Sequence, residues 1–181
     1  MRHLLLAGGT LFAIPLGLAM AQQQASQAQP QQASATIINT KGERIGSARL
    51  TQTPNGVLIQ MDARGLQAGE RASHIHEVGR CNAGDEFESA GGHFNPDGKQ
   101  HGFQVAAGPH AGDMANLVVG QDGSLKAEVH NPKVSLGAGP ASLFDADGSA
   151  LVLHAKPDDH RSQPSGDAGG RIACGVIERR G

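Results

Sequence analysis

The chain has 181 residues, and 15 Lys and Arg residues against 17 Asp and Glu residues give it a formal net charge of −2 at pH 7. With no Trp, no Tyr and five Phe, it has neither the positive charge nor the aromatic residues that general nucleic-acid binding requires, so we expect no nucleic-acid partner. The length suits one domain with its own core.

Residues 1–21 have the pattern of a Sec-type signal peptide. Arg2 provides the positive start, residues 4–18 the apolar stretch, and Ala19-Met20-Ala21 the cleavage site of small residues. An uncleaved membrane anchor is the alternative, but Gly and Pro interrupt the stretch, which is barely long enough to span a bilayer. We therefore expect export to the periplasm and no stable membrane association after cleavage.

The next segment, residues 22–35, is rich in Gln, Ala and Ser. Such a composition offers little to a hydrophobic core and predicts a disordered linker. The folded domain is then expected at residues 36–181.

Short stretches of alternating apolar and polar residues recur through this domain, with turn residues between them. No segment has a sustained helical period, so long helices are not expected and an all-β barrel or sandwich is predicted. The eight predicted strands are residues 36–39, 46–51, 57–62, 72–78, 115–119, 125–129, 150–154 and 171–177.

Two long irregular stretches separate these strands, at residues 79–112 and 155–170. Long loops in a small domain are usually functional or disordered. The first contains three histidines and Cys81, so we interpret it as a loop that a metal and a disulfide hold in order.

Cys81 and Cys174 are the only two cysteines. In an exported chain such a pair is expected to form one disulfide. Two independent buried thiols are the alternative. Redox catalysis by the pair is less consistent with the sequence, because the two residues are far apart and lack a C-x-x-C spacing.

Six of the nine histidines form a pattern suited to two metal ions. Imidazole is a good ligand for copper and for zinc, and a carboxylate can complete a tetrahedral zinc site. On a strand, positions i and i+2 share a face, so His74 and His76 can bind one ion together. No ligand role is assigned to His3, His130 or His160. The candidate ligands are His74, His76, His93, His101, His110, Asp113 and His154.

From about residue 36 to its end, the chain resembles the copper/zinc superoxide dismutase family. The resemblance implies an eight-stranded Greek-key β-barrel or sandwich with a long metal-binding loop and an electrostatic loop. It departs from the family at Ser73 and in the short stretch 155–170. The motifs that carry it are His74-Ile75-His76-Glu77, Gly92-His93-Phe94-Asn95-Pro96, the group His101, His110 and Asp113, and residues 169–177 with Arg171 and Cys174.

The resemblance also implies roles for individual residues. Copper would be bound by His74, His76, His93 and His154, and zinc by His93, His101, His110 and Asp113. His93 would bridge the two ions and take part in catalysis, and Arg171 would attract the anionic substrate. Asp158, or its neighbour Asp159, would link a copper histidine to a zinc histidine.

The implied activity is the dismutation of superoxide anion to oxygen and hydrogen peroxide by a redox-cycling copper beside a structural zinc. The alternative is a periplasmic protein of the same fold that stores or delivers copper or zinc. The resemblance leaves the oligomeric state open, with a homodimer as one alternative.

Overall fold

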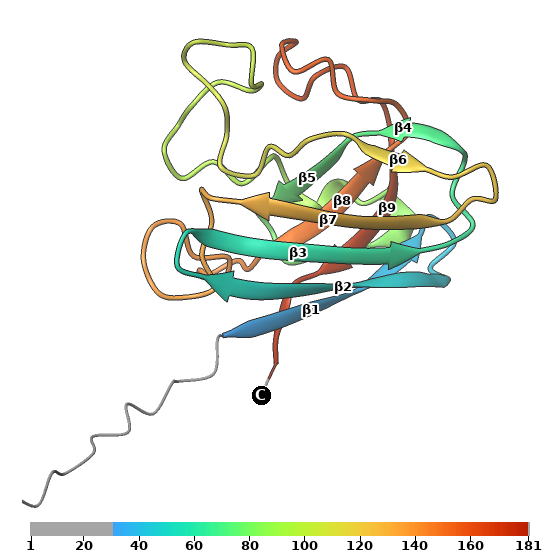
Figure 1. Ribbon diagram of the computed structural model, residues 1–181, viewed down its shortest axis with the longest axis horizontal. Coiled ribbons are helices and arrows are strands. Elements are labelled where there is room, and N and C mark those ends of the chain that lie inside the picture. The colour runs from blue at the N-terminus through green and yellow to red at the C-terminus, as the bar shows by residue number, and fades with distance from the viewer. Residues whose placement is uncertain (1–30, 181) are drawn as a thin grey trace, which may run out of the picture.

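The computed structural model describes residues 31–180 (Figure 1). The predicted signal peptide and most of the predicted linker lie outside the described residues. No helix within residues 31–180 has the length and apolar character needed to cross a membrane.

The all-β prediction is confirmed. All eight predicted strands are present, the one at 150–154 with the predicted bounds and the other seven with shifted ends. Two short strands, at Gly69–Arg71 and Glu178–Arg179, were not predicted. The only helices among the described residues are two single turns, η1 (Ala83–Asp85) and η2 (Glu88–Ala90). The strands are β1 (Gln32–Asn39), β2 (Arg44–Thr53), β3 (Gly56–Ala63), β4 (Gly69–Arg71), β5 (Ser73–His76), β6 (Leu117–Val119), β7 (Leu125–Asn131), β8 (Ala150–His154), β9 (Arg171–Val176) and β10 (Glu178–Arg179).

Most strands belong to one antiparallel sheet that curls on itself into a Greek-key barrel (Figure 1). Its order is β5-β8-β9-β1-β2-β3-β7, and β10 pairs with β1. β4 and β6 form a separate two-stranded ladder. Some neighbours in the sheet are distant in sequence: β1 pairs with β9, with Ile38 opposite Cys174.

Strand β1 begins at Gln32, four residues before the predicted start of the domain. The linker prediction was therefore wrong at residues 32–35. Ala33 and Ala35 are 0% and 2% exposed, and both pair with β2 at Leu50 and Ala48. Alanine in a polar segment gives a weak core signal in sequence, yet it fills the tightly packed space between two walls of a barrel.

Alternation along the strands separates a packed interior from the outer surface. In β3, Val57, Ile59, Met61 and Ala63 are buried, while Gln60 and Asp62 are exposed. The interior side chains form one continuous hydrophobic cluster with residues from the other strands. This packed barrel provides the rigid support from which the loops project.

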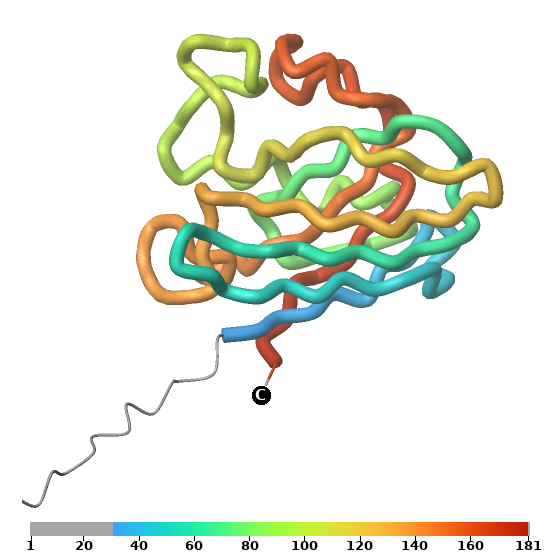
Figure 2. The backbone as a smooth tube through the Cα atoms, in the orientation of Figure 1, coloured from blue at the N-terminus to red at the C-terminus, as the bar shows by residue number. Residues whose placement is uncertain are grey.

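The two long loops lie next to each other at one end of the barrel, as Figure 2 shows for the segments near residues 100 and 160. The contact is direct, since the backbone N–H of Gln104 donates to the carbonyl of His160 at 3.1 Å. The stretch from residue 155 to 170 is short, but it reaches the first loop.

The predicted disulfide is confirmed. Cys81 and Cys174 are bonded, with Cα atoms 5.7 Å apart. The bond attaches the segment that carries η1 and η2 to the middle of β9. Closing a loop of this length stabilises the fold by roughly 4 to 5 kcal/mol in the chain-entropy model.

Candidate metal centre

Strand β5 brings the first two histidines together. His74 and His76 are 0% and 1% exposed and point to the same side, whereas Ile75 between them packs into the core. On one edge β5 pairs with β8, which ends at His154. A register shift between Leu153 and His154 places His154 opposite Arg171 of β9.

The other edge of β5 pairs with two loop segments. Isolated bridges join His76 to His93 and His74 to Asp113. The backbone of Ile75 accepts from Phe94 N–H at 2.8 Å and donates to Gly112 carbonyl at 2.9 Å. Gly112 has to be a glycine, because a Cβ there would overlap the Ile75 carbonyl and lie 3.0 Å from the Phe94 nitrogen. The sheet thus fixes the loop histidine beside the strand histidines.

Four imidazole rings converge with one ring nitrogen each held by a partner. His74 Nε2 lies 2.8 Å from Asp158 Oδ2, and His93 Nδ1 lies 2.9 Å from Asp113 Oδ1. His76 Nδ1 is 3.0 Å from the Gly91 carbonyl, and His154 Nδ1 is 3.2 Å from the Gly169 carbonyl. These contacts fix the orientation of all four rings.

The other nitrogen of each ring is buried and has no hydrogen-bond partner among the described residues: His74 Nδ1, His76 Nε2, His93 Nε2 and His154 Nε2. Each of the four residues has a ligand atom within 4.8 Å of those of the others. A buried polar atom without a partner is costly, so four that converge indicate a ligand that satisfies them together. Four imidazole nitrogens suit copper.

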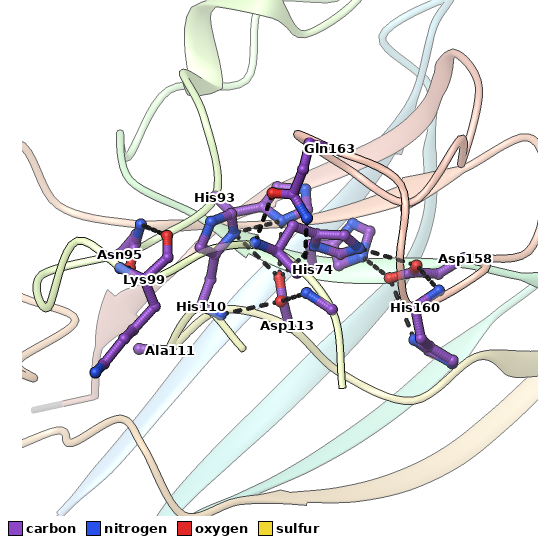
Figure 3. Close-up of polar contacts among 12 residues, drawn as sticks. His74, His93, Asn95, Lys99, His110, Ala111, Asp113, Asp158, His160 and Gln163 are labelled. Atoms are coloured by element: carbon purple, nitrogen blue, oxygen red, sulfur yellow. Dashed lines mark hydrogen bonds and ion pairs between the residues drawn. The ribbon is translucent and has the colours of Figure 1, made fainter. Parts of the chain in front are cut away.

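A second group surrounds the carboxylate of Asp113 (Figure 3). Asp113 Oδ1 lies 2.9 Å from His93 Nδ1, 3.0 Å from His101 Nδ1 and 3.4 Å from His110 Nδ1. A tetrahedral zinc with bonds of about 2.0–2.1 Å separates its ligand atoms by about 3.3–3.4 Å. The three nitrogens lie 2.9 to 3.4 Å from the carboxylate oxygen, close to that separation, so the group could hold a zinc ion.

The carboxylate of Asp113 is held in place by the backbone. Its Oδ2 accepts from the N–H of Gly102 at 2.9 Å and from the N–H of His110 at 3.0 Å. Oδ1 is left to face the three histidines. The metal-binding loop thus uses two of its own amides to orient the one acidic residue of the group.

His93 belongs to both groups, since its Nδ1 faces Asp113 and its Nε2 is the unpaired nitrogen of the first group. The cluster that includes Asp113 by mutual distance also contains His74, whose ring lies 3.9 Å from that of His93, and leaves out His110. However, His74 is bonded to Asp158, whereas His110 Nδ1 lies 3.3 Å from His93 Nδ1. The contacts therefore favour His110 as the fourth member.

Asp158 connects the two groups. Its Oδ2 lies 2.8 Å from His74 Nε2, and its Oδ1 lies 3.0 Å from His101 Nε2. Asn116 holds the backbone of Asp158 through its side-chain amide, with bonds of 2.8 and 2.9 Å. Asp159 instead faces solvent and accepts from the N–H groups of Arg161 and Ser162. Of the two carboxylates that the sequence left open, only Asp158 contacts the histidines.

The electrostatics of the two groups differ. Burial lowers the pKa of His74 to about 4 and that of His154 to about 3, and it lowers the pKa of His76 well below its usual value. Burial also opposes the charge on His101, but bonds to Asp113 and Asp158 outweigh it and raise its pKa to about 9. His74, His76 and His154 are therefore neutral imidazoles at pH 7, the form that binds metals.

Both carboxylates are charged. Although burial opposes ionisation, hydrogen bonds from the histidines, from His101 above all, hold the pKa of Asp113 and of Asp158 far below the usual range. The second group thus carries negative charge around His101. A cation bound there compensates that charge.

Arg171 borders the cavity that leads to the first group. The cavity has a volume of about 220 Å³ and is lined by Arg171 together with His76, His93, His154 and residues of the loop 155–170. The guanidinium donates to the carbonyls of Phe87 at 2.6 Å and Gly91 at 2.8 Å and lies 3.5 Å from Glu88. It is therefore fixed at the entrance and retains donor capacity toward the cavity.

Several contacts of the site were not predicted from the sequence. Gln163 binds the backbone of His101 twice, and Asn116 binds that of Asp158 twice. The carbonyls of Gly91 and Gly169 orient two rings. Backbone acceptors and single amide side chains have no signature in the sequence. The one available signal was that Asn116 is a polar residue directly before the apolar strand β6.

Two of the three histidines without an assigned role fall within residues 31–180, and neither is a member of the two groups. His3 is outside the described residues. His130 is exposed on β7, 3.4 Å from Thr53 Oγ1. His160 donates its backbone N–H to Asp158 Oδ1 at 2.6 Å, and its ring packs on Phe103 at 5.0 Å.

Comparisons with known proteins all find similarity to one family. The family model described as copper/zinc superoxide dismutase matches residues 44–177. Superoxide dismutase [Cu-Zn] 2 of Aquifex aeolicus is 52% identical over 155 residues, which cover 84% of this chain and 90% of that protein. The corresponding enzyme of Caulobacter vibrioides is 42% identical over 149 residues, which cover 81% and 85%.

Among solved structures, the crystal structure of a SOD-like protein from Bacillus subtilis is similar, with a TM-score of 0.76 and 38% sequence identity. The match covers 79% of this chain and 96% of that one.

Proposed function

Because this chain belongs to the copper/zinc superoxide dismutase family, we propose that its two histidine groups are the copper and zinc sites of that enzyme. The protein is an oxidoreductase whose cofactors are copper and zinc and whose substrate is superoxide. Copper is bound by His74, His76, His93 and His154. Zinc is bound by His93, His101, His110 and Asp113.

The observation that carries this assignment is the set of four buried ring nitrogens without partners, one from each proposed copper ligand. In His74, His76 and His154 the opposite nitrogen has a fixed acceptor, which defines the tautomer and orients the lone pair of the free nitrogen. In His93 the opposite nitrogen faces the proposed zinc group. When bound in these groups, copper would supply one-electron redox chemistry for the dismutation of superoxide, and zinc would be redox-inert.

The residues around the site supply the remaining functions. Arg171 attracts the anion into the cavity and orients it by its fixed fork of donors. His93 Nε2 faces the copper group, and we propose that it carries a proton to the reduced oxygen species. His93 Nδ1 stays with Asp113 and the zinc ligands throughout, so the ring keeps its position while its other nitrogen gains and loses a proton.

The test compares two histidine variants. His154→Ala removes one of four copper ligands, so bound copper and the rate of superoxide decay should both fall by at least about a hundredfold. His130→Ala, on the outside of β7, should keep both. Unchanged copper content and activity in His154→Ala would contradict the copper assignment.

The dismutase function is supported over storage or delivery of metal, because the related proteins are named superoxide dismutases and because Arg171 borders the cavity beside the copper group. A delivery protein needs to release copper, whereas these four histidines are buried and fixed by hydrogen bonds.

We also propose that the protein acts in the periplasm. The disulfide between Cys81 and Cys174 supports this location, since such bonds persist in oxidising compartments. Cell fractionation followed by mass spectrometry of the unreduced protein tests it. Recovery in the cytoplasm with both thiols free would contradict the proposal.

A homodimer is the assembly that we propose. The support is an apolar hollow of about 410 Å³ at the metal-binding loop, lined by Met114, Pro109 and Phe103, the last of which is 48% exposed. Covering such a surface with a second copy would remove it from water. Light scattering during size-exclusion chromatography should give twice the mass of the chain, and Phe103→Asp should give the monomer mass.

A further inference from the structure

A second polar hollow lies on the outer face of β1, β2 and β3, away from the metal sites. It has a volume of about 380 Å³ and shares no lining residue with the cavity at Arg171. The inward residues beneath it, Ala35, Ala48 and Met61, are buried in the core. The outward residues at its centre are Ser34, Thr36 and Ser47, whose short side chains leave the space open.

Three arginines border this space: Arg44 and Arg49 of β2, and Arg180 after β10. We call it the arginine hollow. Arg49 stands in register between Ser34 of β1 and Gln60 of β3, at the middle of the sheet. The three guanidinium groups therefore border the arginine hollow from three different positions in the fold.

Within residues 31–180, none of these three guanidiniums forms a hydrogen bond or an ion pair. Those of Arg71, Arg161, Arg171 and Arg179 each donate to an oxygen of the chain. The guanidiniums of the exposed Arg64 and Arg80, which lie outside the arginine hollow, also form no such contact within the described residues. The one acid that lines the arginine hollow is Asp62, which lies 4.0 Å from Lys126 Nζ. Positive charge thus accumulates there in a chain whose net charge is −2.

The positive charge favours an anionic ligand, and the guanidinium groups indicate which kind of anion binds. A guanidinium is charged at all working pH values and binds phosphate through two parallel hydrogen bonds. Three of them around one space raise the local positive potential, which favours a doubly charged group such as a phosphate monoester over a singly charged carboxylate.

The size and the walls indicate what the phosphate is attached to. A volume of about 380 Å³ falls in the range of about 300–1,000 Å³ that is typical of sites for small organic ligands, and it is larger than a bare oxyanion needs. Hydroxyl groups of Ser34, Thr36 and Ser47 and the carboxylate of Asp62 offer hydrogen bonds to ligand hydroxyls. None of the described lining residues is aromatic, so a nucleobase would find no stacking partner.

From these observations we infer that the arginine hollow binds a sugar phosphate, with the phosphate held by Arg44, Arg49 and Arg180 and the sugar by the hydroxyl-lined floor. The ligand is either a free sugar phosphate or the phosphorylated sugar headgroup of a lipid. Both present the same chemistry to the protein.

Isothermal titration calorimetry of the metal-loaded protein at low salt tests the inference, with glucose 6-phosphate, glucose and inorganic phosphate as probes. Glucose 6-phosphate should bind more tightly than inorganic phosphate, and glucose should not bind. Arg49→Ala should weaken glucose 6-phosphate binding about tenfold or more, since a charge-assisted pair is lost. Arg80→Ala, an exposed arginine outside the arginine hollow, should leave binding unchanged.

Dismutase activity and the melting temperature should be equal in Arg49→Ala and the parent, which shows that the variant is folded. Arg49→Lys keeps the charge but loses the fork, so its affinity should lie between those of the parent and the alanine variant. Co-sedimentation with phosphatidylcholine vesicles, with and without monophosphoryl lipid A, identifies the source: binding only to the second indicates a lipid headgroup. The inference is overturned if no probe binds, if inorganic phosphate binds as tightly as glucose 6-phosphate, or if Arg49→Ala binds like the parent.

Discussion

The side chain of Gln163 forms two hydrogen bonds with the backbone of His101. Its Nε2 donates to the carbonyl at 2.8 Å, and its Oε1 accepts from the N–H at 2.9 Å. The pair joins the loop 155–170 to the metal-binding loop at a proposed zinc ligand, as Figure 3 shows for Gln163 above the histidine cluster. Pro164 and Ser165, the next two residues, line the cavity beside the copper group.

Replacing Gln163 with alanine should therefore weaken the zinc site. Two hydrogen bonds of about 1 kcal/mol each are lost, so the metal-free protein should lose about 1–2 kcal/mol of stability and zinc affinity should fall about tenfold. Competition with a chromophoric chelator measures the affinity. Gln121→Ala, in an exposed turn, is the control. Equal zinc affinities in both variants would show that the pair does not support the site.

Gly166 is expected to tolerate no side chain. Its φ is +72°, and a Cβ there would overlap the Asp158 carboxylate and come within 2.7 Å of His101 Nε2. Gly166→Ala should cost about 2–4 kcal/mol and displace Asp158 from the two histidines. Gly170→Ala, where a Cβ meets nothing within 4 Å, should be nearly neutral in urea unfolding. A stable Gly166→Ala protein with normal copper and zinc contents would refute this.

Zinc and copper should differ in the protons that they displace. With a pKa of about 9, His101 is protonated at pH 7, so zinc must release that proton to bind its Nδ1. The pKa values of His74 and His154, about 4 and 3, leave these copper ligands already neutral. Calorimetry at pH 7 in buffers of different ionisation enthalpy should show about one more proton released by zinc than by copper. Equal release by both ions would contradict the assignment.

The metal-free protein should be most stable near neutral pH. The lowered pKa values of His74 and His154 give a contribution that is present above pH 6.5 and is lost as the pH falls toward 4 and 3, because the unfolded chain takes up protons first. The raised pKa of His101 gives a contribution that is complete below 6.5 and is lost as the pH rises through 9. Urea unfolding should show a loss of at least about 3 kcal/mol from pH 7 to 4.5 and a smaller loss toward pH 10. A flat profile would count against these shifts.

Arg171→Ala should reduce the bimolecular rate with superoxide about tenfold or more and flatten its dependence on ionic strength. Arg171→Lys should retain more of both, since it keeps the charge without the fork. Pulse radiolysis from low to moderate salt, on proteins with equal copper contents, measures the rates. If the alanine variant kept the parent's salt slope, the attraction would have to come from other residues, with Lys156 and Arg161 the next to test.

The sequence was sufficient for the parts of the site in which chemistry depends on residue type. Histidine and carboxylate side chains are common ligands of copper and zinc, and the strand period placed His74 and His76 on one face. The sequence was insufficient where two identical side chains differ only in their position in the fold. Asp158 and Asp159 are identical side chains, and only the fold shows that Asp158 is buried against His74 and that Asp159 faces water.

The ends of the strands depend on side-chain packing, which the amino-acid composition does not reveal. β1 starts at Gln32 because Ala33 and Ala35 are buried inside the barrel. In the sequence these alanines stand among polar residues, so the segment was not predicted as a strand. Gln163 had no signal at all, because its partners are backbone atoms that every residue has.

Gly91 shows how this arrangement bears on inherited variation. One main-chain oxygen accepts from both His76 Nδ1 and Arg171, so the residue that orients a proposed copper ligand also positions the residue that we propose attracts the substrate. No substitution elsewhere can delete a backbone atom, which shields the contact from most point mutations. Gly91 itself is the exception, because φ is +75° and a Cβ would lie 2.9 Å from Glu77 Cγ. A substitution of Gly91 should therefore damage copper coordination and substrate capture together.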